Sequence, residues 1–271
     1  MGMGLAKRKL ILPLVFILII ISLLRVLKLT LISSSFSSPR LVLTTFNHEP
    51  FMLPPPIPLN PIRKEKLSKK EFRFLSDILL KKSPCNVLVF GLEEEYLKLE
   101  IINTGGSTVF LENRPERLMK VEGGYNARRV YKTEYKTYAK DAYKLLKYAR
   151  SNSSCDPSLG IKSIMTECKL ALTGLPKEVL KTKWDIIIVD GPCGEGPDSP
   201  GRMGSVFMAG VLARAGNGTN VIVHDVDRMI EKWFSWEFLG EENRVSSKGR
   251  FWNFRIPQQV KNSSRNSALG K

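Results

Sequence analysis

Short apolar runs, each stopped by a polar or turn residue, recur through the middle of the chain. The clearest is 186–189, four consecutive β-branched residues that end at Asp190 and are followed by Gly191-Pro192. A continuous apolar run of this length is typical of a strand buried on both faces, as in the centre of a parallel sheet. Comparable runs predict strands at 86–90, 107–111, 130–135 and 220–223, and an alternating segment predicts a late edge strand at 251–256.

Between these runs, apolar residues recur at helical spacing. Strands that alternate with helices are typical of an α/β domain with a mostly parallel sheet. We therefore expect one such domain at 71–258, with its ligand site beyond the carboxyl ends of the strands. The spacing predicts helices near 71–80, 96–102, 138–149, 203–213 and 231–239, and a loop at 151–161.

The amino-terminal segment has the pattern of a membrane anchor. A basic cluster at 7–9 precedes a run without charges at 10–24, and the sequence stays mainly apolar to position 32. Because basic residues favour the cytosolic side, we expect a cytosolic tail at 1–9 and a signal-anchor helix at 10–32. A cleaved signal peptide is the alternative. Either way, the bulk of the chain is expected to enter the secretory lumen.

The segments that flank the domain are polar or rich in proline. The composition shifts to Pro and Ser after position 32, and 33–70 is expected to form an extended stem that leads into the first helix. The segment 259–271 is expected to be a disordered tail, because it carries too few apolar residues to pack.

The chain is strongly basic. It has 42 Lys and Arg residues against 26 Asp and Glu residues, which gives a formal net charge of +16. This balance indicates an acidic partner, which could be nucleic acid, anionic lipid or an acidic polymer. The expected anchor and the lack of a recognition motif argue against nucleic acid. No C-x-x-C pair is present, so a structural zinc site is not expected.

A lumenal address would permit two kinds of modification. Cys155 and Cys168 could form a disulfide in an oxidising compartment, and two unpaired thiols are the alternative. Three N-x-S/T sequons make Asn152, Asn217 and Asn262 candidates for glycosylation.

Polar residues follow three of the expected strands. Glu93 lies just beyond the first strand, Asp190 ends the central one, and His224 and Asp225 follow the next. The carboxyl ends of parallel strands share one edge, so these side chains are expected to meet there. A histidine and two carboxylates could provide a general base or hold a divalent cation. The alternative is that each residue only completes a strand end.

Glu112 closes the strand at 107–111, about 20 residues after the turn at Gly91. An acid at this distance, after a strand–helix–strand unit, is typical of the nucleotide-binding half of a doubly wound fold. In that fold the acid accepts hydrogen bonds from ribose hydroxyls. The alternative is an acid that serves only solubility. The chain has no G-x-S-x-G motif and no P-loop, which disfavours an esterase, an ATPase and a kinase.

Several sequence blocks occur in order within about 72–257. They are SPCNVLVFGL at 83–92, CKLALTGLP at 168–176, WDIIIVD at 184–190, PGRM at 200–203, HDVDR at 224–228 and GRFW at 249–252. Together these blocks resemble the plant glucuronoxylan 4-O-methyltransferase family.

The resemblance implies an S-adenosylmethionine-dependent methyltransferase with a Rossmann-like sheet. It also implies a single-pass type II protein of the Golgi membrane, with the catalytic domain in the lumen, that methylates O4 of glucuronic acid side chains in cell-wall polysaccharide. A divalent metal is a further implication. Such a substrate is a polyanion, which suits a chain of net charge +16.

The resemblance also implies roles for individual residues. Gly91 would approach the methionine part of the cofactor, and Glu112 would bind its ribose. Asp190 and the His224-Asp225 pair would face the acceptor hydroxyl. Arg202 would bind the uronate carboxylate, because a planar guanidinium holds a carboxylate with two hydrogen bonds.

The chain departs from the family pattern at one cofactor position. The family has Gly-Leu-Gly after the first strand, whereas this chain has Gly91-Leu92-Glu93. The Glu93 carboxylate could pair with the amino group of the cofactor, or it could repel a neighbouring carboxylate. The change is consistent with an acceptor other than glucuronoxylan, such as an arabinogalactan glycan. It is also consistent with a non-catalytic family member that binds polysaccharide or scaffolds other enzymes.

Overall fold

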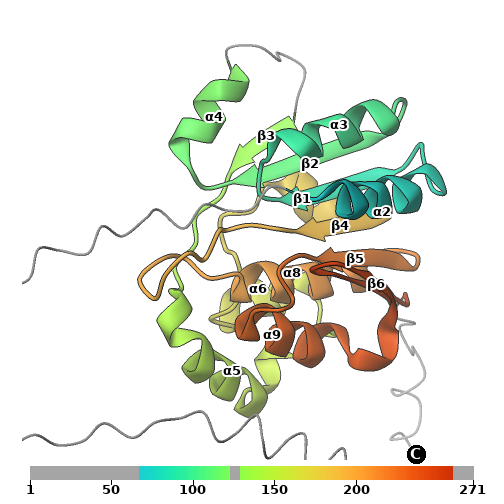
Figure 1. The fold of residues 1–271 in the computed structure, drawn as a ribbon. Coiled ribbons are helices and arrows are strands. Elements are labelled where there is room, and N and C mark those ends of the chain that lie inside the picture. Colours follow the sequence, from blue (N-terminus) through green and yellow to red (C-terminus); the bar gives the residue numbers. More distant parts are fainter. Residues whose placement is uncertain (1–66, 123–128, 259–271) are drawn as a thin grey trace, which may run out of the picture. The chain divides into compact units, whose positions relative to one another are not determined.

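The computed structural model describes residues 67–122 and 129–258, which form a seven-stranded sheet between helices (Figure 1). The strands are β1 Asn86–Phe90, β2 Ser107–Glu112, β3 Arg129–Lys132, β4 Ile186–Val189, β5 Thr219–Val223, β6 Arg244–Lys248 and β7 Phe251–Ile256. The α-helices are α2 Lys69–Leu80, α3 Glu94–Ile102, α4 Pro115–Glu122, α5 Ala142–Ser151, α6 Ile161–Glu167, α7 Lys177–Lys181, α8 Met203–Arg214 and α9 Met229–Leu239.

The strand order is β3-β2-β1-β4-β5-β7-β6. The first five strands in this order are parallel, and β7 runs antiparallel to both β5 and β6. The order reverses between β1 and β4, which pair from Val87 opposite Ile186 to Phe90 opposite Val189. In an open α/β sheet, this reversal opens a crevice at the carboxyl ends of the two strands, where ligands bind.

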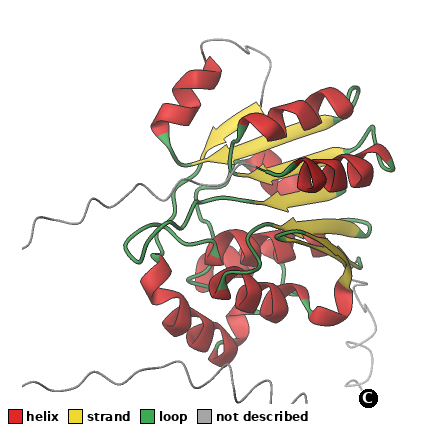
Figure 2. Cartoon of the chain, viewed as in Figure 1, coloured by secondary structure: helices red, strands yellow, loops and turns green. Residues whose placement is uncertain are grey.

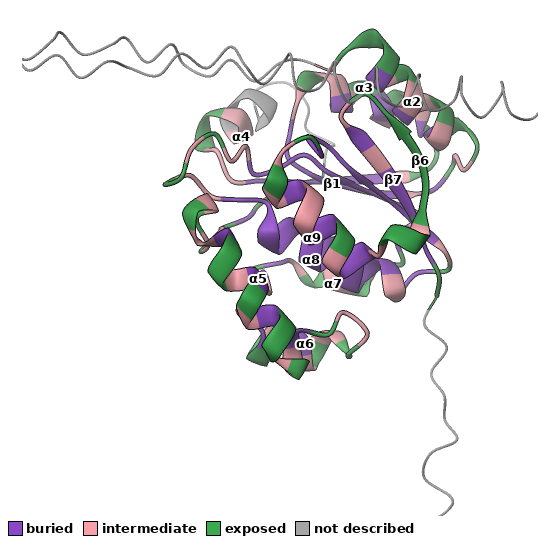
Figure 3. Cartoon of the chain, turned by 60° about the horizontal axis from the view of Figure 1, so that its bottom comes forward, coloured by how far each residue is buried: buried purple, intermediate pink, exposed green. Residues whose placement is uncertain are grey.

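Helices cover both faces of the sheet (Figure 2). One face packs against α2 and α3 through residues such as Leu75 and Leu99. The other face packs against α5, α6, α8 and α9. Because both faces are covered, the central strands are buried along their whole length, as Figure 3 shows. The apolar run at 186–189 therefore has the environment that its composition predicts.

Helix α8 is buried on all sides from Met203 to Ala213. Two glycines allow this close packing. A Cβ added to Gly204 would meet the Leu172 side chain at 2.9 Å, and one added to Gly210 would meet the Phe238 carbonyl oxygen at 3.0 Å. The absence of side chains at these positions lets the segment before α7 and helix α9 approach the α8 backbone. The amino end of α8 is thereby packed against Leu170 and Leu172.

The structure corrects several details of the predicted elements. The segment 251–256 is not an edge strand, because β7 pairs with β5 on one side and β6 on the other. The true edge, β6, is exposed and polar and has no apolar alternation that could reveal it. Helices α4, α6 and α7 were not predicted, β3 is shorter than expected, and the expected loop at 151–161 contains a 3-10 turn. Helix α2 begins two residues before the expected domain boundary, with Ser68 and Glu71 forming a capping box.

The expected modifications fall at different places in the fold. Cys155 and Cys168 are joined by a disulfide, which ties the end of α6 to the turn after α5. Asn152 lies between α5 and that turn, and its amide donates to the Tyr148 hydroxyl at 2.6 Å. Asn217 is exposed, whereas Thr219 of the same sequon is fully buried. Asn262 lies outside the described residues.

No helix within 67–122 and 129–258 is long and apolar enough to cross a membrane. The expected cytosolic tail, anchor and carboxyl-terminal tail lie outside the described residues, as does the expected stem apart from its last four positions.

Candidate active site

The turns that follow β1 and β4, where an open α/β sheet has its ligand crevice, contain two glycines that approach each other closely. Gly91 follows β1 with φ of +103°, a conformation that favours glycine. A Cβ on Gly191 would lie 2.7 Å from the Gly91 amide nitrogen, and a Cβ on Gly91 would lie 3.1 Å from the Gly191 nitrogen. The two turns can therefore cross the strand ends only without side chains. The predicted turns at Gly91 and after Asp190 thus meet at one point.

Glu112 ends β2 beside this crevice, with its side chain almost fully buried. One carboxylate oxygen accepts the Leu92 amide at 2.9 Å, and the other accepts the amides of Asn113 at 2.9 Å and Arg114 at 3.0 Å. Glu112 thereby holds the turn after β1 against the turn after β2. The oxygen that faces Leu92 accepts one backbone hydrogen bond and keeps capacity for a second donor.

Glu93 forms ion pairs with Arg114 and Arg117. Its carboxylate is 3.6 Å from the Arg114 guanidinium and in close contact with that of Arg117. Arg117 also donates to the Leu92 carbonyl at 2.6 Å, and Arg114 lies 3.4 Å from Glu112. The positive charges of the two arginines therefore offset the electrostatic repulsion between the Glu93 and Glu112 carboxylates.

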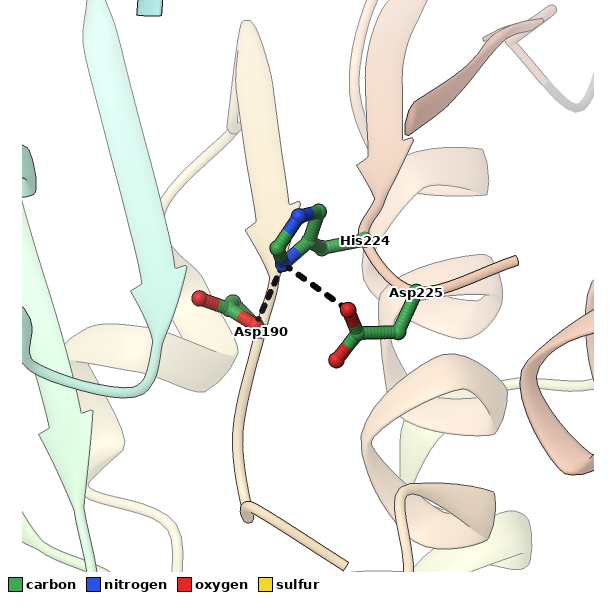
Figure 4. A group of neighbouring side chains, drawn as sticks. All are labelled: Asp190, His224 and Asp225. Atoms are coloured by element: carbon green, nitrogen blue, oxygen red, sulfur yellow. Dashed lines mark hydrogen bonds and ion pairs between the residues drawn. The ribbon is translucent and has the colours of Figure 1, made fainter. Parts of the chain in front are cut away.

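Asp190 and His224 form a buried dyad at the ends of β4 and β5 (Figure 4). The His224 Nδ1 atom is 2.9 Å from an Asp190 oxygen, and the ring stacks on Phe251 at 4.3 Å. The other Asp190 oxygen accepts the Tyr96 hydroxyl at 2.8 Å. Burial first, and then the charge of Asp190, raises the pKa of Tyr96 well above its usual value. Tyr96 therefore stays a hydrogen-bond donor.

The remaining nitrogen of the dyad has no hydrogen-bond partner. His224 Nε2 is buried and lies 3.8 Å from the Glu71 carboxylate of α2. A proton on Nδ1 that is donated to Asp190 leaves a lone pair on Nε2. An imidazole oriented in this way by a carboxylate is the arrangement of a general base.

Asp225 follows His224 with φ of +58°, and it is the one non-glycine residue with positive φ in the described part of the chain. This conformation is uncommon and often marks functional sites, although aspartate tolerates it better than most residues. The Asp225 carboxylate contacts Arg202 at 2.8 Å, Arg228 at 2.6 Å and Arg250 at 3.0 Å. Burial acts to raise the pKa of Asp225, but Arg202 and His224 outweigh it, and the pKa lies below its usual value.

Arg202 is placed differently from the expectation that it binds substrate. It is fully buried, and its guanidinium lies 3.0 Å from Asp190, 2.8 Å from Asp225 and 3.7 Å from Glu231. It also donates to the carbonyls of Pro192 and His224. A guanidinium committed to internal partners is not available to a uronate, so the expected role is corrected to that of a buried counter-ion.

Four charged residues of the site escaped the sequence analysis. Glu71 caps α2 and accepts the Arg250 amide at 2.9 Å, and Glu231 lies beside Arg202 and Arg228. The side chains of Arg228 and Arg250 are 35% and 27% exposed, whereas those of their partner carboxylates are nearly covered. These two arginines are thus the cations beside the dyad that an acceptor could reach. Their signal was present in the HDVDR and GRFW blocks, but nothing in the sequence distinguished them from Arg202.

The expected metal does not fit this arrangement. Ligand atoms of Asp190, His224 and Asp225 lie within 4.8 Å of one another, as a metal centre would require. However, the Arg202 guanidinium contacts both carboxylates at 2.8–3.0 Å, and His224 Nδ1 faces Asp190. A divalent ion bonded to the same oxygens would lie against a fixed positive charge. The buried guanidinium therefore supplies the cation that the carboxylates require.

Comparison with known proteins places this fold and site in a family. The profile of the family described as IRX15/IRX15L/GXM matches residues 70–254, from α2 into β7. The chain belongs to the IRX15/IRX15L/GXM family. This membership confirms the resemblance that the sequence blocks indicated, and the strand order confirms the Rossmann-like α/β sheet that the resemblance implied.

Relatives within the IRX15/IRX15L/GXM family are named for different substrates or for none. Arabinogalactan O-methyltransferase 2 of Arabidopsis thaliana is 40% identical over 70% of this chain and 67% of the relative. Glucuronoxylan 4-O-methyltransferase 1 of the same species is 38% identical over 69% of this chain and 67% of the relative. Protein IRX15-LIKE, also from that species, is 38% identical over 73% and 64%, and its name states no activity.

Among solved structures, a methyltransferase-like protein from Silicibacter pomeroyi matches with a TM-score of 0.39. The two chains are 13% identical, and the match covers 72% of this chain and 89% of that one.

The residues at the crevice are suited to S-adenosylmethionine. The side-chain-free turns at Gly91 and Gly191 leave backbone at the crevice floor, and Glu112 keeps an acceptor for a ribose hydroxyl. Glu93 and Arg117 provide one negative and one positive group, which match the ammonium and carboxylate of the methionine part. Glu93 is therefore an acidic group paired with arginine at the position where the family pattern has glycine.

Proposed function

We propose that this protein is an S-adenosylmethionine-dependent O-methyltransferase that acts on O4 of glucuronic acid side chains of cell-wall polysaccharide, either glucuronoxylan or arabinogalactan. Membership of a family whose relatives are named for both reactions carries this proposal. The identities of 40% and 38% are too similar to choose between the two polymers. We place the protein in the Golgi membrane with its domain in the lumen, on the strength of the apolar pattern at 10–32 and the disulfide.

The cofactor, when bound, supplies a methyl group on a sulfonium sulfur. The sulfur is a good leaving group because it departs as a neutral thioether. The protein has to align the acceptor hydroxyl with that methyl group and to remove a proton from the hydroxyl. We assign proton removal to Nε2 of His224, because this nitrogen carries the unpartnered lone pair. Asp190 then orients the ring through Nδ1 and stabilises the imidazolium that forms, while Tyr96 and Arg202 hold Asp190 in place.

Arg228 and Arg250 are assigned to the uronate carboxylate. Both flank Asp225 and remain partly exposed, so a carboxylate that enters from solvent can reach them. Arg250 also lies 3.8 Å from Glu71, which neighbours Nε2 of His224. Binding of a uronate by Arg250 would thus draw this side chain away from its internal partners and place the neighbouring hydroxyl near the imidazole.

The test is methyl transfer from radiolabelled S-adenosylmethionine to demethylated glucuronoxylan and to arabinogalactan oligosaccharides, with the lumenal domain as enzyme. His224→Gln and Asp190→Asn should each lower the rate by about 10²–10⁴-fold, the usual contribution of a general base and its orientation. Both variants should bind the cofactor like the wild-type protein in calorimetry. Full activity in either variant would remove its assigned role.

A non-catalytic role in polysaccharide binding or scaffolding is the second candidate. Glu93 at a glycine position and relatives whose names state no activity favour it. Calorimetry separates the two functions. If S-adenosylmethionine does not bind at millimolar concentration while acidic polysaccharide does, the protein is a binding member of the family.

A further inference from the structure

A groove of about 430 Å³, lined by both charged and apolar residues, lies outside the dyad and its arginines. One wall runs from Lys132, the last residue of β3, through the segment that follows it, which includes Lys136. The other wall is the segment 168–174, with Lys169 and Thr173. The volume is within the range of small-ligand sites in proteins. No role in the proposed reaction has been given to any of these side chains.

The groove carries a net positive charge. Lys132, Glu134 and Lys136 alternate with better-covered residues, so the three exposed side chains point to one side of the segment. Lys169 is exposed on the opposite wall. Three lysines therefore face one glutamate, and Glu134 lies 3.6 Å from Lys132. Lys132 and Lys136 are at most about 14 Å apart along the chain.

The Lys169 wall is held firmly in place. Lys169 follows Cys168, which is bonded to Cys155, and its ammonium lies 5.0 Å from the centre of the Tyr148 ring. The next residues pack against the amino end of α8, where a Cβ on Gly204 would meet the Leu170 carbonyl at 3.2 Å. The groove is therefore built on the rigid part of the domain.

The opposite wall runs directly to the proposed reaction site. Lys132 is paired with Glu112 in the β2–β3 register, and the Thr133 amide donates to the Glu112 carbonyl at 2.9 Å. Further along, the Gly201 amide donates to the Thr137 carbonyl at 3.2 Å, and Gly201 immediately precedes Arg202. A polymer bound in the groove would thus lie beside both the cofactor crevice and the buried charge network.

We propose that this groove is a second binding site for the acceptor, in which Lys132, Lys136 and Lys169 bind carboxylates of uronate residues that flank the one being methylated. This inference rests on the proposed function for the identity of the ligand. A neutral polysaccharide has no group that would match three lysines, whereas a chain that carries several glucuronate substituents does. The groove would give the protein a preference for polymeric acceptors that are acidic at more than one position.

The test uses the triple variant Lys132→Gln, Lys136→Gln, Lys169→Gln in the full-length protein. Binding is measured by calorimetry with glucuronoxylan that carries several glucuronates per chain, at low and at high salt. We expect affinity to fall on the order of tenfold at low salt, as suits the loss of three exposed charge contacts, and the difference to shrink at high salt. A neutral xylan should bind both proteins equally weakly.

A matched variant controls for net charge. Lys81→Gln, Lys98→Gln, Lys248→Gln also removes three exposed lysines, but from the residue after α2, from α3 and from β6. This control should retain the affinity of the wild-type protein. If it loses as much affinity as the groove variant, or if the groove variant loses none, the inference is wrong.

Methylation of a short acceptor with one glucuronate separates the groove from the proposed function. The groove variant should methylate it like the wild-type protein, while its KM for the multiply substituted polymer rises by about the same factor as the loss of affinity. An unchanged KM for the polymer would overturn the groove assignment and leave the methyltransferase intact. If neither acceptor is methylated by any form but polymer binding still depends on the three lysines, the groove stands and the proposed reaction fails.

Discussion

Arg202 gives the sharpest test of how this site is held together. The residue is fully buried, and its guanidinium is surrounded by carboxylates. Asp190 lies at 3.0 Å, Asp225 at 2.8 Å and Glu231 at 3.7 Å. We consider the variant Arg202→Met, because methionine retains much of the side-chain length and all of its apolar stem. The change therefore removes the charge and leaves the packing of α8 nearly intact.

The expected loss is large because the three carboxylates remain buried. Removing one partner of a buried ion pair costs about 3–5 kcal/mol, since the other charge is left without compensation. Most domains are stable by only about 5–15 kcal/mol, so this loss should be visible as a large fall in the urea midpoint at unchanged m-value. Arg202→Lys should lose less, because it keeps the charge but not the planar contacts to several acceptors.

The pH dependence makes the prediction specific. In the wild-type protein the pKa values of Asp225 and Glu71 lie below their usual values. The stability that they contribute is therefore present above their unfolded pKa values and is lost as the pH falls through the lower folded values, so it should fall below about pH 4. Without Arg202, burial prevails and the buried carboxylates hold protons more tightly in the folded state. The variant should then gain stability as the pH falls from 8 to 5.

The assay is urea unfolding at pH 8 and pH 5, with Arg150→Met as the control. Arg150 pairs with Glu237 at 2.6 Å, but its side chain is 60% exposed, so the control should shift the midpoint only slightly at either pH. The reasoning is refuted if Arg202→Met costs no more than the control, or if its deficit against the wild-type protein widens at pH 5.

Three further predictions follow from other parts of the site and fold. Replacing Cys155 and Cys168 by serine should lower the free energy of unfolding by about 3 kcal/mol, the entropic effect expected for a short loop; a loss under about 1 kcal/mol by urea unfolding would contradict this. Glu93→Gln should weaken cofactor binding in calorimetry by about tenfold or less, because its charge is already paired with arginine; complete loss of binding would show that the carboxylate is indispensable. Treatment with EDTA should leave methyl transfer unchanged, because Arg202 supplies the cation between the carboxylates; loss that is restored by a divalent ion would show that a metal displaces the guanidinium.

The sequence by itself determined the sheet and the edge at which the site lies. The runs at 86–90, 107–111, 186–189 and 220–223 are almost fully apolar, and a strand buried on both faces can hardly have another composition. The polar residues that end these strands follow from the same pattern, because parallel strands bring their carboxyl ends together. Glu112, Asp190, His224 and Asp225 are therefore predictable from the sequence alone.

Elements without a strong periodic signal were not predictable. Strand β6 is polar and exposed, and it exists because β7 offers it an unpaired edge. Helices α6 and α7 have only seven and five residues, too few for the apolar spacing to be distinguished from a loop. Their ends are fixed by packing against the rest of the domain.

Only the tertiary structure decided what each charged residue does. Arg202, Arg228 and Arg250 are alike in the sequence, yet the first is enclosed by carboxylates and the other two keep contact with solvent. Burial and the sign of the neighbouring charges decide whether a guanidinium stabilises the fold or meets a substrate, and both depend on segments far apart in the chain. The same holds for Glu71, which meets the His224 turn only because α2 packs across the end of β7.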